Sequence, residues 1–314
     1  LEGHTKEVTS VAMTEDGQYV ISGSGDKTVK VWELTSGRLL RSLEGHTGGV
    51  NGVAVTPDGQ YVISGSGDKT VKVWELTSGR LLRSLEGHTE LVMSVAVTGD
   101  GQYVVSASRD KTVKVWELSS GRLLHSLEGH VDSVASVAIT MDGQYVVSGS
   151  GDKTIKVWEL ASGRLLRSLE GHTRFVRSVA VTGDGRHVVS ASYDKTIKVW
   201  ELCSGRLLRS LEGHTVNAVA VTEDGQYAVS GLNDGIVKVL DISALLNSEL
   251  SSGRLLRSLY GHTDSVMSVA VTKAGEVVSG SWDETIKVWE LANGKLLRLL
   301  KGHTGGVMSV AVTG

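Results

Sequence analysis

The sequence predicts an all-β protein built as a ring of seven four-stranded antiparallel sheets, and two observations support this prediction. First, a Gly-His pair recurs along the 314 residues at a spacing of 42 five times, then 48, then 41. Second, each interval holds four short stretches of strand-like sequence joined by polar turns that contain glycine. Self-similarity at such a period is typical of repeat architectures. The histidines of the pairs are His4, His46, His88, His130, His172, His214, His262 and His303.

The first repeat shows the four expected strands in order. Residues 8–14 (VTSVAMT) alternate and end at the turn EDG, and residues 19–24 (YVISGS) follow. A tight GDK turn leads to residues 28–34 (TVKVWEL), and TSG leads to residues 38–45 (RLLRSLEG). The last stretch has leucines at helical spacing, but about eight residues between glycines are too few for a stable helix. A strand is therefore expected there as well.

One small sheet of this kind cannot bury both of its faces, so neighbouring copies must stack. A ring of such blades achieves this and leaves few exposed edges. The sequence therefore predicts a single seven-bladed β-propeller domain over residues 1–314. One surplus first strand, residues 305–314 (GGVMSVAVTG), follows the seventh set. Three roles stay open for it: competition with residues 8–14 for the first blade, pairing with another chain in self-association, or the start of an eighth blade.

The motif at the end of each repeat resembles that of a known family. A Gly-His pair at a strand end, an Asp in the next tight turn and a Trp a few residues later resemble the WD40 family of β-propellers, over essentially the whole chain. The dipeptide here is Trp-Glu rather than Trp-Asp, a departure at an exposed position. The resemblance implies a hydrogen-bonded structural clamp in each blade that also uses one of two serines, Ser22 or Ser24 in the first. The clamp residues implied are His4, Asp26, Trp32, His46, Asp68, Trp74, His88, Asp110, Trp116, His130, Asp152, Trp158, His172, Asp194, Trp200, His262, Asp283 and Trp289.

The sixth repeat departs from this pattern at two clamp positions. Leu240 stands where the other repeats have tryptophan, and Leu232 replaces a serine. A leucine has no indole N–H to donate. Blade six is therefore expected to have the weakest clamp.

The repeated polar residues do not predict an enzyme or a cofactor site. Every repeat carries the Ser, His and Asp of an acyl-transfer triad, but seven copies of a catalytic triad make no chemical sense, so no catalytic residue is expected. The Gly-His histidines lie on separate blades and do not converge as metal ligands must. No phosphate-binding loop spacing is present. We expect no metal and no cofactor.

Bulk composition narrows the partner classes. The formal net charge of −3 argues against nucleic acid, although Arg109, Arg174 and Arg177 keep a nucleic-acid partner as a rival hypothesis. The lysines and arginines of KTVKVW and RLLRSL are expected on a solvated outer surface. No apolar run is long enough for a membrane helix, and no signal peptide is visible at residue 1. The single cysteine, Cys203, fits a reducing compartment, so a cytoplasmic location is expected.

Three positions vary while the frame around them repeats. Two flank the valine that opens each first strand, and the third precedes the turn Asp. The resemblance implies that all three lie on the top face of the propeller, where partners commonly dock. Large apolar, aromatic and arginine side chains are enriched at interface cores. The predicted partner-binding residues are Leu91, Met93, Arg109, Phe175, Arg177, Tyr193, Asn217, Asn233, Met267 and Trp282.

The fourth repeat has small residues at these positions. Ala135 and Gly151 lie between the bulky third and fifth repeats, so a shallow groove floored by these two residues is expected. Neutral drift on an exposed turn is the alternative explanation of the variation.

The predicted function is a non-enzymatic interaction scaffold or sensor that binds a protein or peptide on its top face. Similarity to the highly repetitive WD40 arrays of bacterial, especially cyanobacterial, signalling proteins implies that it belongs to a larger signalling protein. The alternative is a structural or engineered repeat propeller with no specific natural partner. Cys203, Leu240 and an eight-residue insertion at 244–251 argue against design. The insertion is expected on the bottom face.

Overall fold

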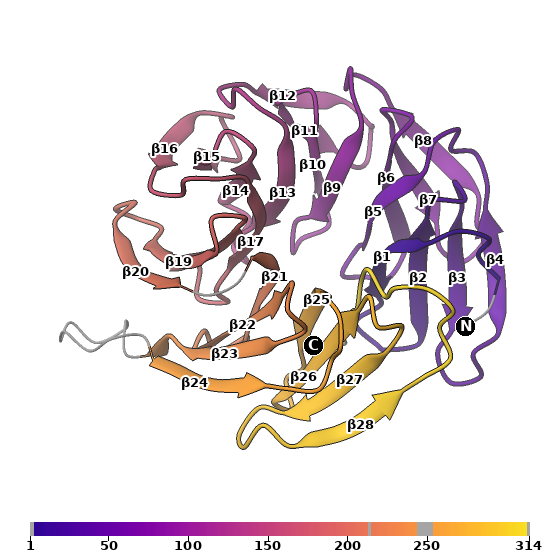
Figure 1. Cartoon of the computed structure of the whole chain (residues 1–314). Helices are drawn as coiled ribbons and strands as arrows, with labels where there is room; N and C mark the ends of the chain where they lie inside the picture. The colour runs from indigo at the N-terminus through magenta and orange to yellow at the C-terminus, as the bar shows by residue number, and fades with distance from the viewer. Residues whose placement is uncertain (1–2, 213–214, 244–253, 313–314) are drawn as a thin grey trace.

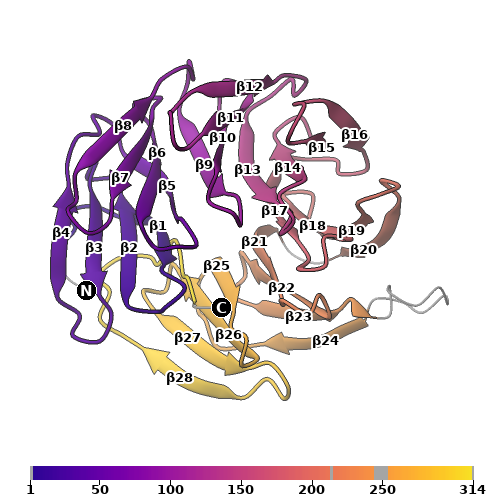
Figure 2. The ribbon, with the colours of Figure 1, turned by 180° about the vertical axis from the view of Figure 1, so that it is seen from behind.

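The computed structural model describes residues 3–212, 215–243 and 254–312, and the insertion at 244–251 lies outside these ranges. Within them, 28 strands form seven four-stranded antiparallel sheets, each in simple sequence order. The sheets stand around a central axis as the blades of a propeller, with β1, β5, β9, β13, β17, β21 and β25 innermost (Figures 1 and 2). The predicted fold class and blade number are confirmed.

The strands of blades one to four have nearly identical lengths. Blade one comprises β1 (Val8–Met13), β2 (Tyr19–Ser24), β3 (Val29–Glu33) and β4 (Leu39–Leu43). Blade two comprises β5 (Val50–Val55), β6 (Tyr61–Ser66), β7 (Val71–Glu75) and β8 (Leu81–Leu85). Blade three comprises β9 (Val92–Val97), β10 (Tyr103–Ser108), β11 (Val113–Glu117) and β12 (Leu123–Leu127). Blade four comprises β13 (Val134–Ile139), β14 (Tyr145–Ser150), β15 (Ile155–Glu159) and β16 (Leu165–Leu169).

The remaining three blades follow the same order. Blade five comprises β17 (Val176–Val181), β18 (His187–Ser192), β19 (Thr196–Glu201) and β20 (Leu207–Glu212). Blade six comprises β21 (Val216–Val221), β22 (Tyr227–Leu232), β23 (Val237–Asp241) and β24 (Arg254–Leu259). Blade seven comprises β25 (Val266–Val271), β26 (Glu276–Ser281), β27 (Ile286–Glu290) and β28 (Leu296–Leu300).

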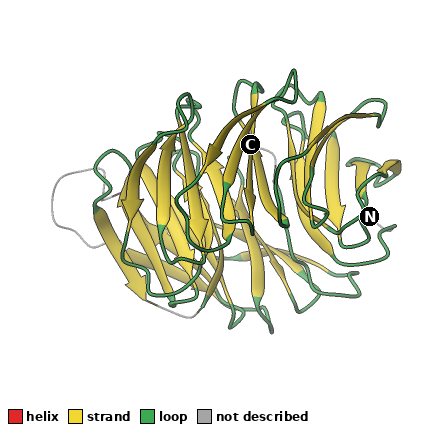
Figure 3. Cartoon of the chain, turned by 90° about the horizontal axis from the view of Figure 1, so that it is seen from above, coloured by secondary structure: helices red, strands yellow, loops and turns green. Residues whose placement is uncertain are grey.

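The strands run between two loop-bearing faces (Figure 3). We call one of them the display face: it carries the turn between the second and third strands of each blade and the loop that leads into the next blade. The opposite face carries the other two turns. Among the residues described, no helix is long and apolar enough to cross a membrane.

The hydrophobic core lies between neighbouring blades. Ile21 and Leu43 of blade one, for example, cluster with Trp74 and Leu76 of blade two, and all four are at most 4% exposed. The same arrangement recurs at each boundary from blade two to blade seven. Because each blade buries its faces only against its neighbours, the stability of any one blade depends on both of them.

The lysines of the third strands correct one expectation. The second lysine of each KTVKVW motif does not lie on a solvated surface: Lys30 and its equivalents in blades two to five and seven are 6–8% exposed. In blade one, the Lys30 ammonium donates to the Ser42 hydroxyl at 3.1 Å. The aliphatic stem is buried while the polar tip finds a partner on the fourth strand, as long cationic side chains often do.

The surplus segment, of which the structure describes residues 305–312, lies outside the seven sheets and has no strand assignment. It does not displace β1, which keeps its full antiparallel pairing with β2. The chain runs from β28 back toward the centre of the ring (Figure 1), where Ser309 and Val310 contact β1 and β25.

Candidate interaction surface

Each blade of standard sequence contains a buried hydrogen-bonded clamp. In blade two, the His46 ring contacts the Asp68 carboxylate through Nδ1 at 2.7 Å and the Ser64 hydroxyl through Nε2 at 2.8 Å. The Trp74 indole donates to the same hydroxyl at 2.8 Å, and Thr70 donates to Asp68 at 2.7 Å. The clamp links the loop into the blade, the β6–β7 turn and two strands. The same contacts occur in blades one, three, four, five and seven.

The structure decides which serine completes the clamp. In blade one it is Ser22, whose hydroxyl contacts His4 and accepts from Trp32. The Ser24 hydroxyl instead donates to the Lys6 carbonyl and accepts the Asp26 N–H. Sequence reasoning missed the threonine that follows the turn, Thr28 in this blade, although it recurs two residues after the Asp in every repeat except the sixth.

The clamp of blade two lowers the pKa of both its aspartate and its histidine. Burial alone raises the pKa of the Asp68 carboxyl, but hydrogen bonds from Thr70, the Thr47 N–H and His46 outweigh it and bring that pKa down to about 2. Burial lowers the pKa of the His46 imidazole by more than the Asp68 carboxylate raises it. A neutral imidazole held against an ionised carboxylate is therefore the favoured pair at neutral pH.

Blade six lacks this arrangement among its described residues. Among the described residues, the buried hydroxyl of Ser230, the counterpart of Ser22, has no hydrogen-bond partner, and Leu240 supplies no indole N–H. Ile236 also replaces the threonine, and His214 lies outside the described residues. A cavity of about 40 Å³ borders Leu240. The expectation of a weak clamp in this blade stays a prediction, because its histidine lies outside the described residues.

The variable positions of the display face form directly bonded pairs. The residue before the turn Asp donates its N–H to the carbonyl of the residue before the first-strand valine: Arg109 to Leu91 at 2.9 Å and Tyr193 to Phe175 at 3.0 Å. The rings of Phe175 and Tyr193 lie 5.6 Å apart at an angle of 33°. Aromatic side chains at these positions therefore sit side by side on one blade.

The pairs also approach one another across blade boundaries. A Cβ on Gly67 of blade two would lie 3.8 Å from Leu91 of blade three, and one on Gly151 of blade four would lie 3.0 Å from Phe175 of blade five. A Cβ on Gly306 of the surplus segment would lie 2.7 Å from the Trp282 ring of blade seven. The display positions thus follow one another along the ring instead of forming isolated sites.

The motifs described above agree with comparisons to known proteins. The family model "WD domain, G-beta repeat" matches residues 1–33, 37–75, 79–117, 121–159, 163–201, 205–241 and 253–290. The chain belongs to the WD40 family. Propellers of this family generally mediate protein interactions and commonly bind proteins or peptides.

The proteins similar to this WD40 chain match either a single repeat or nearly the whole chain. Curated relatives match only one repeat: the ribosome biogenesis protein BOP1 homologs of Drosophila grimshawi and Drosophila ananassae are 52% and 55% identical over 41 residues, 13% of this chain and 5% of those proteins. The crystal structure of the computationally designed Ika8 protein matches 99% of this chain and 92% of its own, with 38% identity and a TM-score of 0.86.

A bulge in the first strand of every WD40 blade sets the direction of the second variable side chain. The register with the second strand shifts at residues 9, 51, 93, 135, 177, 217 and 267. Bulges re-aim side chains and often lie beside functional sites. Here the bulge turns Asn51 toward the next blade, where its amide donates to the Val92 carbonyl at 2.8 Å.

The predicted partner-binding residues therefore differ in exposure. Asn217 is only 7% exposed and donates to the Val266 carbonyl at 3.0 Å, so it links blades six and seven instead of presenting a free amide. The remaining nine residues are accessible to different degrees. Those exposed at the turn are Arg109, Tyr193, Asn233 and Trp282, and those half-buried beside it are Leu91, Met93, Phe175, Arg177 and Met267.

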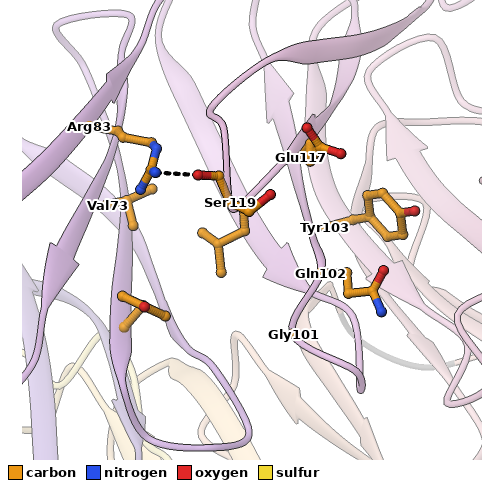
Figure 4. A pocket seen from close by; sticks show the side chains of 9 residues that line it. Val73, Arg83, Gly101, Gln102, Tyr103, Glu117 and Ser119 are labelled. Carbon is orange, nitrogen blue, oxygen red and sulfur yellow. Dashed lines mark hydrogen bonds between the residues drawn. The ribbon is translucent and has the colours of Figure 1, made fainter.

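Two hollows lie at blade boundaries and are lined by residues other than the display positions. One, of about 470 Å³, lies between blades two and three, where Arg83 donates to the Ser119 carbonyl beside Tyr103 (Figure 4). A matching hollow lies between blades four and five. Since they recur with the repeat, they belong to the blade packing. No cluster of potential metal ligands is found among residues 3–212, 215–243 and 254–312.

Proposed function

We propose that this WD40 propeller is a non-enzymatic docking platform that binds a peptide segment of a partner protein across the display face of blades three to five. The observation that carries the proposal is the arrangement of the display positions there. The Leu91–Arg109 pair of blade three and the Phe175–Tyr193 pair of blade five lie on the two blades next to Gly151. A Cβ on Gly151 would lie 2.8 Å from the Asp132 carboxylate and 3.0 Å from the Phe175 ring. A low floor between two bulky walls suits an extended segment.

The floor of this groove is narrower than the sequence indicated. Gly151 is half-buried at the turn, whereas Ala135 is only 5% exposed within the first-strand bulge. A bound segment would therefore pass over Gly151, and Ala135 would support it from below.

The side chains also suggest the chemistry of that segment. Phe175 and Tyr193 offer ring faces and edges for one apolar or aromatic side chain. Arg109 and Arg174 are exposed, and Arg177, two residues after Phe175, is half-buried. Arginines beside aromatic rings favour carboxylates and aromatic groups. We therefore infer a peptide with one large apolar residue flanked by acidic residues.

The clamp supports a non-enzymatic role. The serine hydroxyl that would act as nucleophile is buried in each intact clamp, and Ser64 for example is fully covered. It already accepts the hydrogen bond of the indole. A nucleophile must reach the substrate and be activated by its base, and no surface path is open to this hydroxyl. We propose that the propeller is part of a larger signalling protein in the cytoplasm. A reducing compartment is consistent with the exposed free thiol of Cys203.

Selection of binding peptides from a random library, followed by titration of the best binder, tests the proposal. Tyr193→Gly combined with Arg109→Gly restores the plain repeat residue and should weaken binding at least tenfold. Met141→Ala, which removes an exposed apolar side chain on the opposite face, is the matched control and should not change affinity. The display-face site would be refuted if the selected peptides kept their affinity for the double glycine variant but bound Met141→Ala more weakly.

A second candidate is a repeat propeller without a specific partner, either structural or engineered. The likeness to a computationally designed protein over 99% of this chain favours it. The same selection separates the two candidates, because a surface without a binding role should yield no enriched peptide family that depends on Tyr193.

A further inference from the structure

Residues 305–312 occupy an eighth position in the inner ring. Neighbouring first strands are joined by a recurring contact, in which a valine N–H donates to a serine hydroxyl of the preceding blade. This contact occurs at four boundaries between the seven blades. The surplus segment makes both halves of this contact. Val310 donates to Ser268 of blade seven at 3.1 Å, and Val11 of blade one donates to Ser309 at 3.1 Å.

Side-chain packing gives the same placement. The Cγ1 atoms of Val307 and Val310 lie 2.6 and 2.9 Å from where a Cβ on Gly280 would stand, the same two distances that the valines of blade two show around Gly23. The segment is therefore seated like the first strand of a blade. Among the described residues, no strand pairs with its outer edge.

Two leucines, one on each blade beside this segment, are exposed where their equivalents are buried; we call them the two apolar walls. Leu34 of blade one is 44% exposed, whereas its equivalents in blades two to seven are 3–8% exposed. Leu300 of blade seven is 47% exposed, whereas its equivalents in blades one to four and six are 1–3% exposed. At an ordinary boundary these two positions pack into one cluster, as Leu43 and Leu76 do. Outside the inner position that residues 305–312 fill, the boundary between blade seven and blade one is therefore uncovered.

A clamp histidine lies at the same opening. His303 is exposed, while the histidines of the intact clamps in blades two to five and seven are 6–7% exposed against their Asp and Ser partners. In every intact clamp those partners come from the second strand and the turn that follows it. His303 precedes a first strand for which the described residues supply no second or third strand.

We propose that this opening binds the second, third and fourth strands of one further repeat with this chain's own sequence pattern. The second strand pairs with the free edge of residues 307–312. Its serine and turn Asp contact His303, as in the other clamps. The leucine of its fourth strand packs on Leu34, and the leucine after its Trp-Glu packs on Leu300. This occupant alone satisfies the backbone edge, both apolar walls and the histidine, so a flat protein surface is a poorer fit.

A labelled peptide with the sequence of residues 143–170 tests the proposal, because it carries strands two to four of a blade with an intact clamp. Titration of the whole 314-residue chain, followed by fluorescence anisotropy, should show saturable binding of one peptide per chain. Bound peptide should also raise the melting temperature of the chain. A scrambled peptide of the same composition should do neither.

Variants separate a clamp-directed site from non-specific apolar contact. His303→Ala should weaken peptide binding at least tenfold, about 1.4 kcal/mol. It should not change the unfolding of the peptide-free chain, because the ring is exposed. His125→Ala, a histidine of the outer strand of blade three, should leave the affinity unchanged. Leu300→Arg should also weaken binding by placing a charge on one wall.

Three results would overturn the proposal. One is the absence of saturable binding of the repeat peptide. Another is equal affinity of wild type and His303→Ala. The third comes from sedimentation velocity: if the chain forms dimers that Leu300→Arg dissolves and that exclude the peptide, a second copy occupies the opening instead.

Discussion

Replacing Trp158 by leucine should show how much one clamp contributes to stability. Trp158 is 1% exposed and its indole N–H donates to the Ser148 hydroxyl at 2.9 Å. Blade six already has a leucine at this position. A cavity of about 40 Å³ borders that leucine, and the Ser230 hydroxyl has no hydrogen-bond partner among the described residues. The variant Trp158→Leu should leave a similar cavity in blade four and remove one partner of Ser148.

The magnitude follows from those defects. A cavity of 40 Å³ costs about 1 kcal/mol at about 24 cal/mol per Å³. The lost hydrogen bond costs about 1 kcal/mol, since the hydroxyl keeps His130 as a partner. Loss of the larger apolar surface of the indole adds about 1 kcal/mol. The free energy of unfolding should therefore fall by about 3 kcal/mol.

Equilibrium urea unfolding followed by far-UV circular dichroism measures this loss, and hydrogen exchange shows whether it begins in blade four. The reciprocal variant Leu240→Trp is the matched control, because it fills the cavity and gives Ser230 a donor. It should raise the free energy of unfolding by about 1 kcal/mol. A loss below about 1 kcal/mol for Trp158→Leu would refute the reasoning, since the clamp would then contribute less than a single hydrogen bond.

Two further predictions concern acid and backbone strain. The pKa of Asp68 is lowered to about 2 and that of His46 is lowered from 6.5, so the unfolded chain binds more protons than the folded chain as the pH falls. Stability should therefore drop between about pH 7 and pH 2, and a urea midpoint that rose on acidification would contradict this. Lys153 has a φ of 73° in the turn of blade four, where glycine is favoured, so Lys153→Gly should raise the free energy of unfolding by about 0.5 kcal/mol. Arg164→Gly, at an exposed residue without a positive φ, is the control and should lower it in the same urea assay.

The fold could be predicted from the sequence because the information is repeated. The 42-residue period, glycine turns and apolar alternation all indicate the same four-stranded unit, and seven copies average out local ambiguity. The leucines at helical spacing in residues 38–45 form β4, as expected. Agreement of this kind across local and global signals is what specifies a single fold.

Side-chain environments within the unit were harder to predict. Alternation places Lys30 on the same face of β3 as Trp32, but it does not reveal that this lysine is buried or that Ser42, its cross-strand neighbour on β4, accepts its hydrogen bond. Likewise, variability at residue 217 suggested a displayed amide, whereas the first-strand bulge directs Asn217 into the next blade. A period-two pattern assigns a face of a strand, and only the packed neighbours decide whether that face meets water.

The surplus segment shows the same limit at the level of the whole ring. Its sequence, like that of any other first strand, indicates where it belongs within a blade but not how many positions the ring holds. That number is a property of the closed assembly, and it becomes visible only in contacts between distant ends of the chain, such as Val11 with Ser309. The exposed Leu34 and Leu300 carry the same information. Both match buried residues in sequence, so their exposure results from their place in the ring, where no described strand packs against them, rather than from the residues themselves.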